Sequence, residues 1–127
     1  MILIDADIAI DILRNHPPAI EWLERESTVE VTVLGYTAME LLQGARDRAA
    51  ERRVEGLLAD LDLVWPGSEA GMLAMEIFRL YRLSHSIGLV DAFVAGGAIA
   101  MKVPLQSFNQ KHFAPVQGLE LRQPYAR

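Results

Sequence analysis

Cysteine is absent from the 127-residue sequence, so the chain has neither a disulfide framework nor thiolate ligands for a metal. Long apolar stretches are missing too. The longest, from Ile87 to Met101, is interrupted by Asp91, whereas a membrane span needs about 18–20 apolar residues. The chain reaches Asp5 without a basic segment, which argues against a signal peptide. These absences favour a cytoplasmic protein without a membrane partner.

Lysine is scarce, because only Lys102 and Lys111 accompany ten arginines, and the formal net charge is −5. An excess of acid argues against binding nucleic acid through surface charge alone. It does not argue against a nuclease, because a site that holds divalent metal must itself be acidic, and the metal returns positive charge. Hydrophobic residues make up 51% of the chain, enough for one core, so we expect a single domain over residues 1–127.

Short apolar runs alternate with helical patterns along the chain. Strands are predicted at residues 2–4, 29–33, 63–65, 103–105 and 119–121. Helices are expected at 6–14, 17–25, 37–60 with a break near 46, from a cap at Ser68 to the break at 86–88, and from 91 onward. On the helix after Ser68, Leu73, Ile77 and Leu80 are expected to share one face. This alternation predicts an α/β domain with a mainly parallel sheet of four or five strands, covered by helices on both faces.

Four polar residues stand out by their position relative to these elements. Asp5 directly follows the first strand, Glu40 is expected in the first turn of a helix after the second strand, and Asp91 opens an otherwise uncharged helix. Asn109 lies four positions after Leu105, the residue that ends the fourth predicted strand. Because the carboxyl ends of parallel strands meet at one edge of a sheet, these side chains can converge there.

A cluster of carboxylates suits one kind of chemistry in particular. Phosphodiester cleavage needs an activated water and neutralisation of charge on the phosphate and the leaving oxygen, and Mg²⁺ or Mn²⁺ supplies both. These ions prefer oxygen ligands. Without metal, neighbouring acids repel one another and their pKa values rise. The sequence therefore predicts metal binding that tightens as the pH rises.

Each of these residues also has a purely structural interpretation. Asp5 and Asp91 are suited to cap the helices that they precede. Glu40 follows Thr37 by three positions, the spacing of a capping box in which the glutamate turns back to the helix start. Asn109 is a common turn residue. Taken one at a time, the residues leave these alternatives open.

Four segments occur in the order of the motifs of a known family. They are residues 4–14, Ile-Asp-Ala-Asp-Ile-Ala-Ile-Asp-Ile-Leu-Arg; residues 37–45, around Glu40; residues 89–95, around Asp91; and residues 107–113, around Asn109. Together they resemble PIN-domain toxins of the VapC type, and the resemblance spans nearly the whole chain. It implies a PIN-like three-layer α/β domain.

The resemblance also implies a function. Members of the family are Mg²⁺- or Mn²⁺-dependent ribonucleases that cut structured RNA, often tRNA or ribosomal RNA. They usually form homodimers, and a VapB-like antitoxin inhibits them by covering the acidic groove with its C-terminal tail. By this resemblance Asp5, Glu40 and Asp91 would be metal ligands. Asn109 takes the position of a fourth acid, and Ser107 that of the neighbouring hydroxyl.

Three departures from the family pattern concern the site. Ala6 replaces a usual threonine and so removes a hydroxyl beside the metal. Phe108 stands where arginine is frequent, which weakens a phosphate contact. Asn109 is neutral where many relatives have aspartate, which lowers the charge available to a second metal.

Other polar residues have less specific roles. Asp7 either joins Asp5 in the site or caps the first helix, while Asp11 is expected to point to solvent. Arg14, near the end of that helix, is the better candidate for contact with phosphate or antitoxin. His112 is expected to have a packing or hydrogen-bonding role. The four arginines between residues 46 and 53 interleave with acids and are expected to form a solvated helix face.

Two other functions remain open. Asp5-Ala6-Asp7 after a strand also matches the opening of haloacid-dehalogenase-like phosphohydrolases, in which Asp5 would be the nucleophile and Asp7 an acid–base. The chain is short for that class and lacks its G-D-x-x-x-D motif. The other possibility is a catalytically inactive PIN fold that acts as a binding module, and the intact set of acids argues against it.

Overall fold

All five strands that the structure describes pair in parallel, in the order β3-β2-β1-β4-β5. The computed structural model describes residues 1–26 and 31–127. Its strands are β1 (Ile2–Ile4), β2 (Val31–Leu34), β3 (Asp62–Val64), β4 (Leu105–Gln106) and β5 (Leu121–Arg122). Its helices are α1 (Ala6–Leu13), α2 (Pro17–Arg25), α3 (Gly35–Gln43), α4 (Arg48–Asp60), α5 (Ser68–His85), α6 (Leu89–Met101) and α7 (Gln110–Phe113).

The chain begins in the middle of this sheet. β1 pairs with β2 on one side, where Ile2 lies opposite Val31, and with β4 on the other, where Leu3 lies opposite Leu105. After β3 the chain returns past β1 through α5 and α6 before it forms β4. The order of the strands therefore reverses between β1 and β4. Such a reversal leaves a crevice beyond the carboxyl ends of the two strands, where ligands bind in open α/β sheets.

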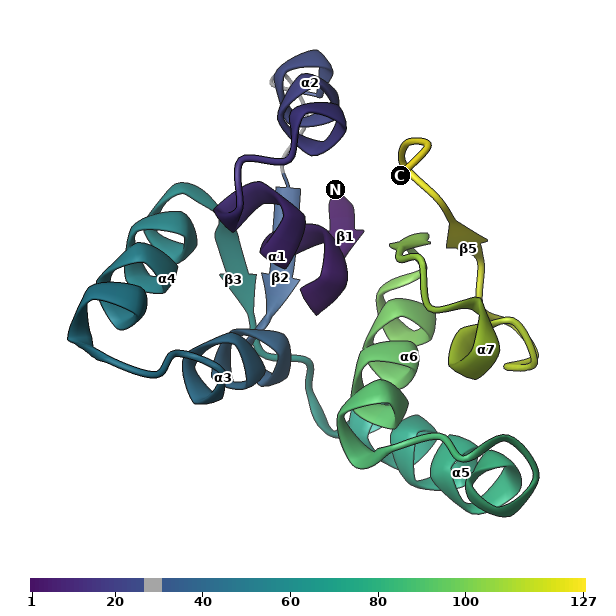
Figure 1. The fold of residues 1–127 in the computed structure, drawn as a ribbon. Coiled ribbons are helices and arrows are strands. Elements are labelled where there is room, and N and C mark those ends of the chain that lie inside the picture. The colour runs from purple at the N-terminus through teal and green to yellow at the C-terminus, as the bar shows by residue number, and fades with distance from the viewer. Residues whose placement is uncertain (27–30) are drawn as a thin grey trace.

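Helices cover both faces of the sheet (Figure 1). Successive strand residues point to opposite faces, so each strand contributes to two separate cores. The core under α5, α6 and α7 takes Leu3, Leu34 and Leu105 from the strands. The core under α1, α2, α3 and α4 takes Ile4, Val31 and Val33. This arrangement confirms the predicted three-layer α/β fold. Within residues 1–26 and 31–127, no helix is long and apolar enough to cross a membrane.

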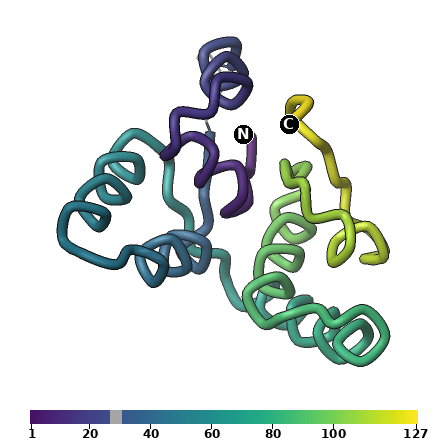
Figure 2. The backbone as a smooth tube through the Cα atoms, viewed as in Figure 1, coloured from purple at the N-terminus to yellow at the C-terminus, as the bar shows by residue number. Residues whose placement is uncertain are grey.

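The helices α5 and α6 pack closely side by side (Figure 2). A Cβ atom on Gly96 of α6 would lie 2.7 Å from the carbonyl oxygen of Ala70 and 2.8 Å from the amide nitrogen of Ala74. Only glycine permits this approach between the two backbones. The packing fixes the position of α6, whose first turn carries Asp91.

The structure moves the predicted start of three helices. The helix expected from Thr37 begins at Gly35, so Glu40 lies in its second turn and not in the first. A side chain at position 35 would collide with the ring of Trp65, and glycine lets the helix start directly after β2. The break near residue 46 is confirmed, since α3 and α4 are separate. Asp91 is the third residue of α6, and Ser68 is the first residue of α5 and not its cap.

Other predictions fail for single residues on a helix face or at the end of a strand. Leu80 is 51% exposed, because the buried face of α5 runs instead through Ala70, Ala74 and Ile77. Trp65 lies outside β3, and Pro104, which has no N–H to give to a ladder, lies outside β4. Residues 29 and 30 of the predicted second strand lie outside the described residues.

Candidate active site

Asp5 lies at the crevice where the strand order reverses. It directly follows β1, and its backbone N–H donates to the carbonyl of Gln106 at the end of β4 over 3.0 Å. Its side chain is only 6% exposed. Although Asp5 precedes α1, its carboxylate makes no capping hydrogen bond to that helix. Asp5 therefore occupies the cap position of α1, but its side chain does not cap the helix.

Ser107 connects Asp5 to the segment after β4. It is completely buried, and its hydroxyl lies 2.9 Å from Asp5 Oδ2 and 3.2 Å from Asp7 Oδ2. A hydroxyl carries one hydrogen, so the shorter contact with Asp5 is the stronger of the two. Ser107 Oγ also accepts the backbone N–H of Asn109 over 3.0 Å. One hydroxyl thus joins two of the predicted site residues with Asp7.

Asp7 fastens the segment after β4 to α1. Its Oδ2 accepts the backbone N–H of Phe108 over 2.7 Å, and its Oδ1 accepts the N–H of Ile8 over 2.8 Å. The first bond brings Asp7 into the cluster around Asp5, and the second satisfies a free N–H in the first turn of α1. Asp7 therefore lies beside Asp5 and also binds an N–H in the first turn of α1, although Asp5 and not Asp7 occupies the cap position of that helix.

Asp91 is held by the short helix α7. The Nδ1 atom of His112 lies 2.8 Å from Asp91 Oδ2, which also receives the N–H of Gly88 over 3.4 Å. Asn109 caps α7 by accepting the backbone N–H of His112 over 3.3 Å, and its Nδ2 lies 3.2 Å from the same ring nitrogen. The shorter contact with Asp91 assigns the ring hydrogen to Nδ1. His112 has the expected hydrogen-bonding role, and Asn109 has the local role expected of a turn residue.

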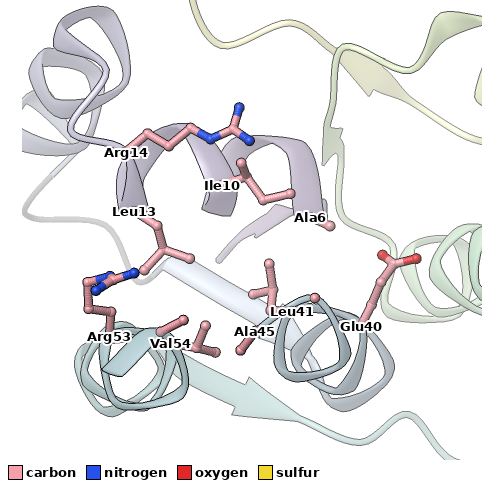
Figure 3. A pocket seen from close by; sticks show the side chains of 11 residues that line it. Ala6, Ile10, Leu13, Arg14, Glu40, Leu41, Ala45, Arg53 and Val54 are labelled. Atoms are coloured by element: carbon pink, nitrogen blue, oxygen red, sulfur yellow. The ribbon is translucent and has the colours of Figure 1, made fainter. Parts of the chain in front are cut away.

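Glu40 does not belong to a capping box. The helix begins at Gly35, so Thr37 is already inside it, and Leu34 occupies the cap position. The Thr37 hydroxyl is buried without a hydrogen-bond partner. Glu40 is exposed, and Figure 3 shows its carboxylate beside Ala6, the residue after Asp5. Partial burial and the charge of Asp91 both raise the pKa of Glu40. The capping-box interpretation is therefore wrong.

The site carries an excess of negative charge. Burial raises the pKa of Asp5 to about 7, and the charges of Asp7 and Asp91 contribute in the same direction. The hydrogen bonds from the Ala6 backbone and from the Ser107 hydroxyl lower the pKa of Asp5 without cancelling these effects. In the described part of the chain, no basic side chain forms an ion pair with Asp5. The carboxyl is therefore poised to give up its proton when a cation arrives.

These donors suit Mg²⁺ or Mn²⁺, which bind carboxylate oxygens. Among residues 1–26 and 31–127, no three acidic or histidine side chains are already gathered as a metal site. Asp5, Glu40 and Asp91 are nevertheless close enough for Asp91 to raise the pKa of both other acids. Mg²⁺ usually keeps several waters and takes one or two carboxylates directly. A loose arrangement of these acids therefore fits such an ion.

A pocket of about 500 Å³ opens beside Glu40, between α1, α3 and α4. Figure 3 shows the Glu40 carboxylate at one end, next to Ala6, and the Arg14 and Arg53 side chains away from that end. Between them the wall is apolar and includes Ile10, Leu13, Leu41, Ala45 and Val54. Arg14 thus lies on the site side, as expected. All four arginines between residues 46 and 53 are exposed, as expected of a solvated helix face, and Arg53 also lines this pocket.

Asp11 was predicted to point to solvent and is instead only 6% exposed. Nε and a terminal nitrogen of Arg127 donate to its two oxygens over 3.1 and 3.0 Å, and the Tyr125 hydroxyl donates over 2.8 Å. Burial alone would raise the pKa of Asp11, but these hydrogen bonds and the charge of Arg127 hold it below its usual value. The partners lie 114 and 116 positions away, so local sequence patterns contain no signal for them.

Comparison with known families agrees with this fold. The profile of the PIN domain matches residues 2–118, so the chain belongs to the PIN domain family. This match confirms that the four motifs were correctly interpreted as those of a PIN domain.

Individual relatives are more distant. The chain is 24% identical over 124 residues, 94% of each protein, to the tRNA(fMet)-specific endonuclease VapC of Salmonella typhimurium. It is 28% identical over 123 residues to ribonuclease VapC19 of Mycobacterium tuberculosis, covering 94% of this chain and 98% of that protein. Among solved structures, DNA-bound VapBC from Salmonella typhimurium superposes with a TM-score of 0.83 at 23% identity, over 98% of this chain and 99% of that chain.

Proposed function

We propose that this protein is the ribonuclease toxin of a VapC-type toxin–antitoxin pair, and that it hydrolyses phosphodiester bonds in structured RNA such as tRNA or ribosomal RNA. The observation that carries the proposal is the buried Asp5 carboxyl, which lies at the reversal of strand order and whose pKa is raised to about 7 by burial and neighbouring acids. The relatives from Salmonella typhimurium and Mycobacterium tuberculosis, which are named as a VapC endonuclease and a VapC ribonuclease, support the same activity.

In this proposal Asp5, Glu40 and Asp91 would hold Mg²⁺ or Mn²⁺. The bound ion would supply an activated water and neutralise charge on the phosphate. Ser107 orients Asp5 through its hydroxyl, and Asp7 holds Ser107 and the following residue in place. Each of these groups acts on the geometry of the Asp5 carboxylate.

Asn109 has an indirect role in the proposed site. Its carbonyl oxygen is used to cap α7, and its amide lies next to the His112 ring that contacts Asp91. We therefore assign Asn109 to positioning Asp91 through His112. This role does not require the negative charge that an aspartate would bring to the same position.

Arg14 and Arg53 are suited to bind RNA phosphates in the pocket beside Glu40. A guanidinium group binds a phosphate through two parallel hydrogen bonds, and the apolar wall between the arginines and Glu40 can take a nucleobase. The same pocket would accept a segment of an inhibiting protein, so both ligands would compete for Arg14.

A VapB-like antitoxin is the proposed protein partner. Solved structures with this fold include VapBC complexes from Salmonella typhimurium and Rickettsia felis, each bound to DNA. We also propose that the toxin is a single-domain, cytoplasmic homodimer. An apolar surface formed by Met39, Leu42 and Leu89, all exposed, lies beside Glu40 and is suited to self-association.

A phosphohydrolase of the haloacid-dehalogenase kind is less compatible with the contacts in the site. Asp7 would have to move a proton to and from the leaving group. Its Oδ2 is instead held by the Phe108 N–H and the Ser107 hydroxyl, and its Oδ1 by Ile8. The nuclease assignment requires no such freedom of Asp7.

The test is a cleavage assay on total tRNA and ribosomal RNA with Mg²⁺ or Mn²⁺, with and without EDTA. Wild type should give discrete, metal-dependent fragments, and Asp5→Asn should give none. Asp60→Asn, which removes an exposed acid at the end of α4, should cleave like wild type. If folded, antitoxin-free wild type does not cleave, the protein is a binding module with a PIN fold.

A further inference from the structure

Tyr125 and Arg127 attach the segment after β5 to α1 through Asp11. Figure 1 draws this segment in yellow, beyond β5. Arg127 holds both oxygens of Asp11 in a fork, and the Tyr125 hydroxyl donates to the same carboxylate. Because Asp11 is nearly buried, this is a fixed attachment between distant parts of the chain. We refer to Asp11, Phe108, Tyr125 and Arg127 as the α1 clamp.

The Phe108 ring is the fourth member of the α1 clamp. The guanidinium carbon of Arg127 lies 4.8 Å from the centre of the Phe108 ring. The ring of Tyr125 meets it edge to face, with centroids 5.0 Å apart. Both geometries are attractive contacts of aromatic rings. His16 and Trp22 border Tyr125 from the other side, with centroids 6.2 Å away in each case.

The backbone of Phe108 is in contact with the proposed site. Its N–H donates to Asp7 over 2.7 Å, and the preceding residue is Ser107, whose hydroxyl lies 2.9 Å from Asp5. A displacement of the Phe108 ring that is passed to its backbone therefore moves the Ser107 hydroxyl relative to the Asp5 carboxylate. Tyr125 and Arg127 each contact both this ring and Asp11, and the ring also packs against the core under α1.

We propose that Tyr125 and Arg127 are positioning residues of the active site, which keep the Ser107 hydroxyl on Asp5 by holding Phe108 against α1. For its effect on catalysis this inference rests on the proposed function, whereas the positioning itself does not. An ion pair whose arginine is about half exposed adds little net stability, but its fork of hydrogen bonds fixes geometry. Displacements of about 1 Å at a catalytic group are enough to slow a reaction strongly.

The experiment compares Arg127→Gln and Tyr125→Phe with Arg122→Gln. Arg122 provides the matched control, because it forms an ion pair of 2.8 Å with Glu120 in the same stretch of chain, and both side chains are exposed. Tyr125→Phe removes one hydroxyl and keeps the ring, so it preserves the packing. The readouts are amide hydrogen exchange residue by residue, Mn²⁺ affinity by titration calorimetry, and kcat and KM for RNA cleavage.

We expect the amides of Phe108 and Asn109 to exchange at least about tenfold faster in Arg127→Gln, while the amide of Leu105 in β4 exchanges as in wild type. Tyr125→Phe should give a smaller change at the same two amides. In both variants kcat should fall with KM little changed, because RNA contacts are intact. Arg122→Gln should match wild type in every readout.

Two results would overturn the inference. One is unchanged exchange at Phe108 and Asn109 in Arg127→Gln. The other is faster exchange at Leu105 to the same degree, which would mean that the α1 clamp only stabilises the whole fold. If wild type cleaves no RNA, the proposed function fails, but hydrogen exchange still decides the positioning role on its own.

Discussion

The hydroxyl of Ser107 lies 2.9 Å from the carboxylate of Asp5, across 102 positions of the sequence. Asp5 follows β1 and Ser107 follows β4, so this bond spans the reversal of strand order in the sheet. It gives the buried carboxylate one donor but no positive charge, and Asp7 and Asp91 still repel it. Ionisation of Asp5 is therefore unfavourable in the folded protein, and several measurements can detect this cost.

Asp5→Asn should stabilise the metal-free protein at high pH. Because the pKa of Asp5 is raised from 3.8 to about 7 on folding, its ionisation is unfavourable in the folded state. The cost is absent below about pH 4, grows as the pH rises and is complete above about pH 7. In EDTA at pH 8 the free energy of unfolding should increase, by on the order of 2–4 kcal/mol. The increase should shrink as the pH falls toward 5. Chemical denaturation at both pH values, with Asp60→Asn as control, checks this, and an increase independent of pH would contradict it.

Mn²⁺ binding should tighten between pH 6 and pH 7.5 and then level off. The ion binds the ionised carboxylate, and below about pH 7 a proton must first leave Asp5. Calorimetric titrations in two buffers with different ionisation enthalpies would reveal the released proton at pH 6. The same titrations should show none at pH 8. Asp5→Asn should bind Mn²⁺ much more weakly at both values, and proton release that persists in this variant would assign the proton to another group.

Glu40→Gln should abolish cleavage while changing stability little. Glu40 is exposed and does not cap α3, so its replacement falls within the range of about ±0.5 kcal/mol typical of surface positions. Its pKa is raised by partial burial and by Asp91, so removal of its charge relieves repulsion in the site. Thermal melts and the RNA cleavage assay, run together, test both statements. A collapse of melting with retained cleavage would restore the capping role.

Thr37→Val tests further whether Thr37 and Glu40 form a capping box or whether Thr37 lies inside the helix and Glu40 belongs to the site. The Thr37 hydroxyl is buried and lacks a partner, so valine of the same shape should be neutral or stabilising by about 1 kcal/mol. A capping residue would instead lose about 1 kcal/mol on losing its hydroxyl.

The sequence was informative where a residue's role depends on its own strand or helix. Asp5 could be placed because a short apolar run ends directly before it, and parallel strands then bring its neighbours to the same edge. The four segments that resemble the family motifs, taken in their order along the chain, assigned Glu40, Asp91 and Asn109 to the same predicted site. The spacing of Thr37 and Glu40 misled because it resembles a capping box, although the helix starts two residues earlier.

Contacts that depend on distant segments could not be predicted. Asp11 lies on α1, in a segment whose apolar residues alone suggest which side is buried. Its partners Tyr125 and Arg127 reach it only because β5 adds to the edge of the sheet after β4. A polar residue on a helix is usually solvated, and nothing local distinguishes one that has a distant arginine.

Gly96→Ala should destabilise the fold, and Gly56→Ala should stabilise it. A Cβ at position 96 would lie 2.7 Å from a backbone oxygen of α5, so the two helices must separate. Such overpacking costs about 1–3 kcal/mol. At position 56 of α4 the space is open, and alanine in an exposed helix interior gains about 0.5–1 kcal/mol over glycine. Denaturant unfolding of the two variants measures the difference, and equal effects would mean that α5 and α6 do not pack closely in solution.

Asn109→Asp should bind Mn²⁺ several-fold more tightly than wild type, by about 0.5–1 kcal/mol of added attraction at a half-exposed position. The substitution can keep the cap of α7, because Oδ1 still accepts the His112 N–H. It replaces Nδ2 with an oxygen 3.2 Å from His112 Nδ1, which gives the ring hydrogen a second acceptor beside Asp91. Asn15→Asp adds the same charge at the end of α1 and serves as control. If both variants gain equally, the effect is one of overall charge; if only Asn109→Asp gains, this position lies within reach of the metal, and the neutral side chain of the natural sequence limits how strongly the ion is held.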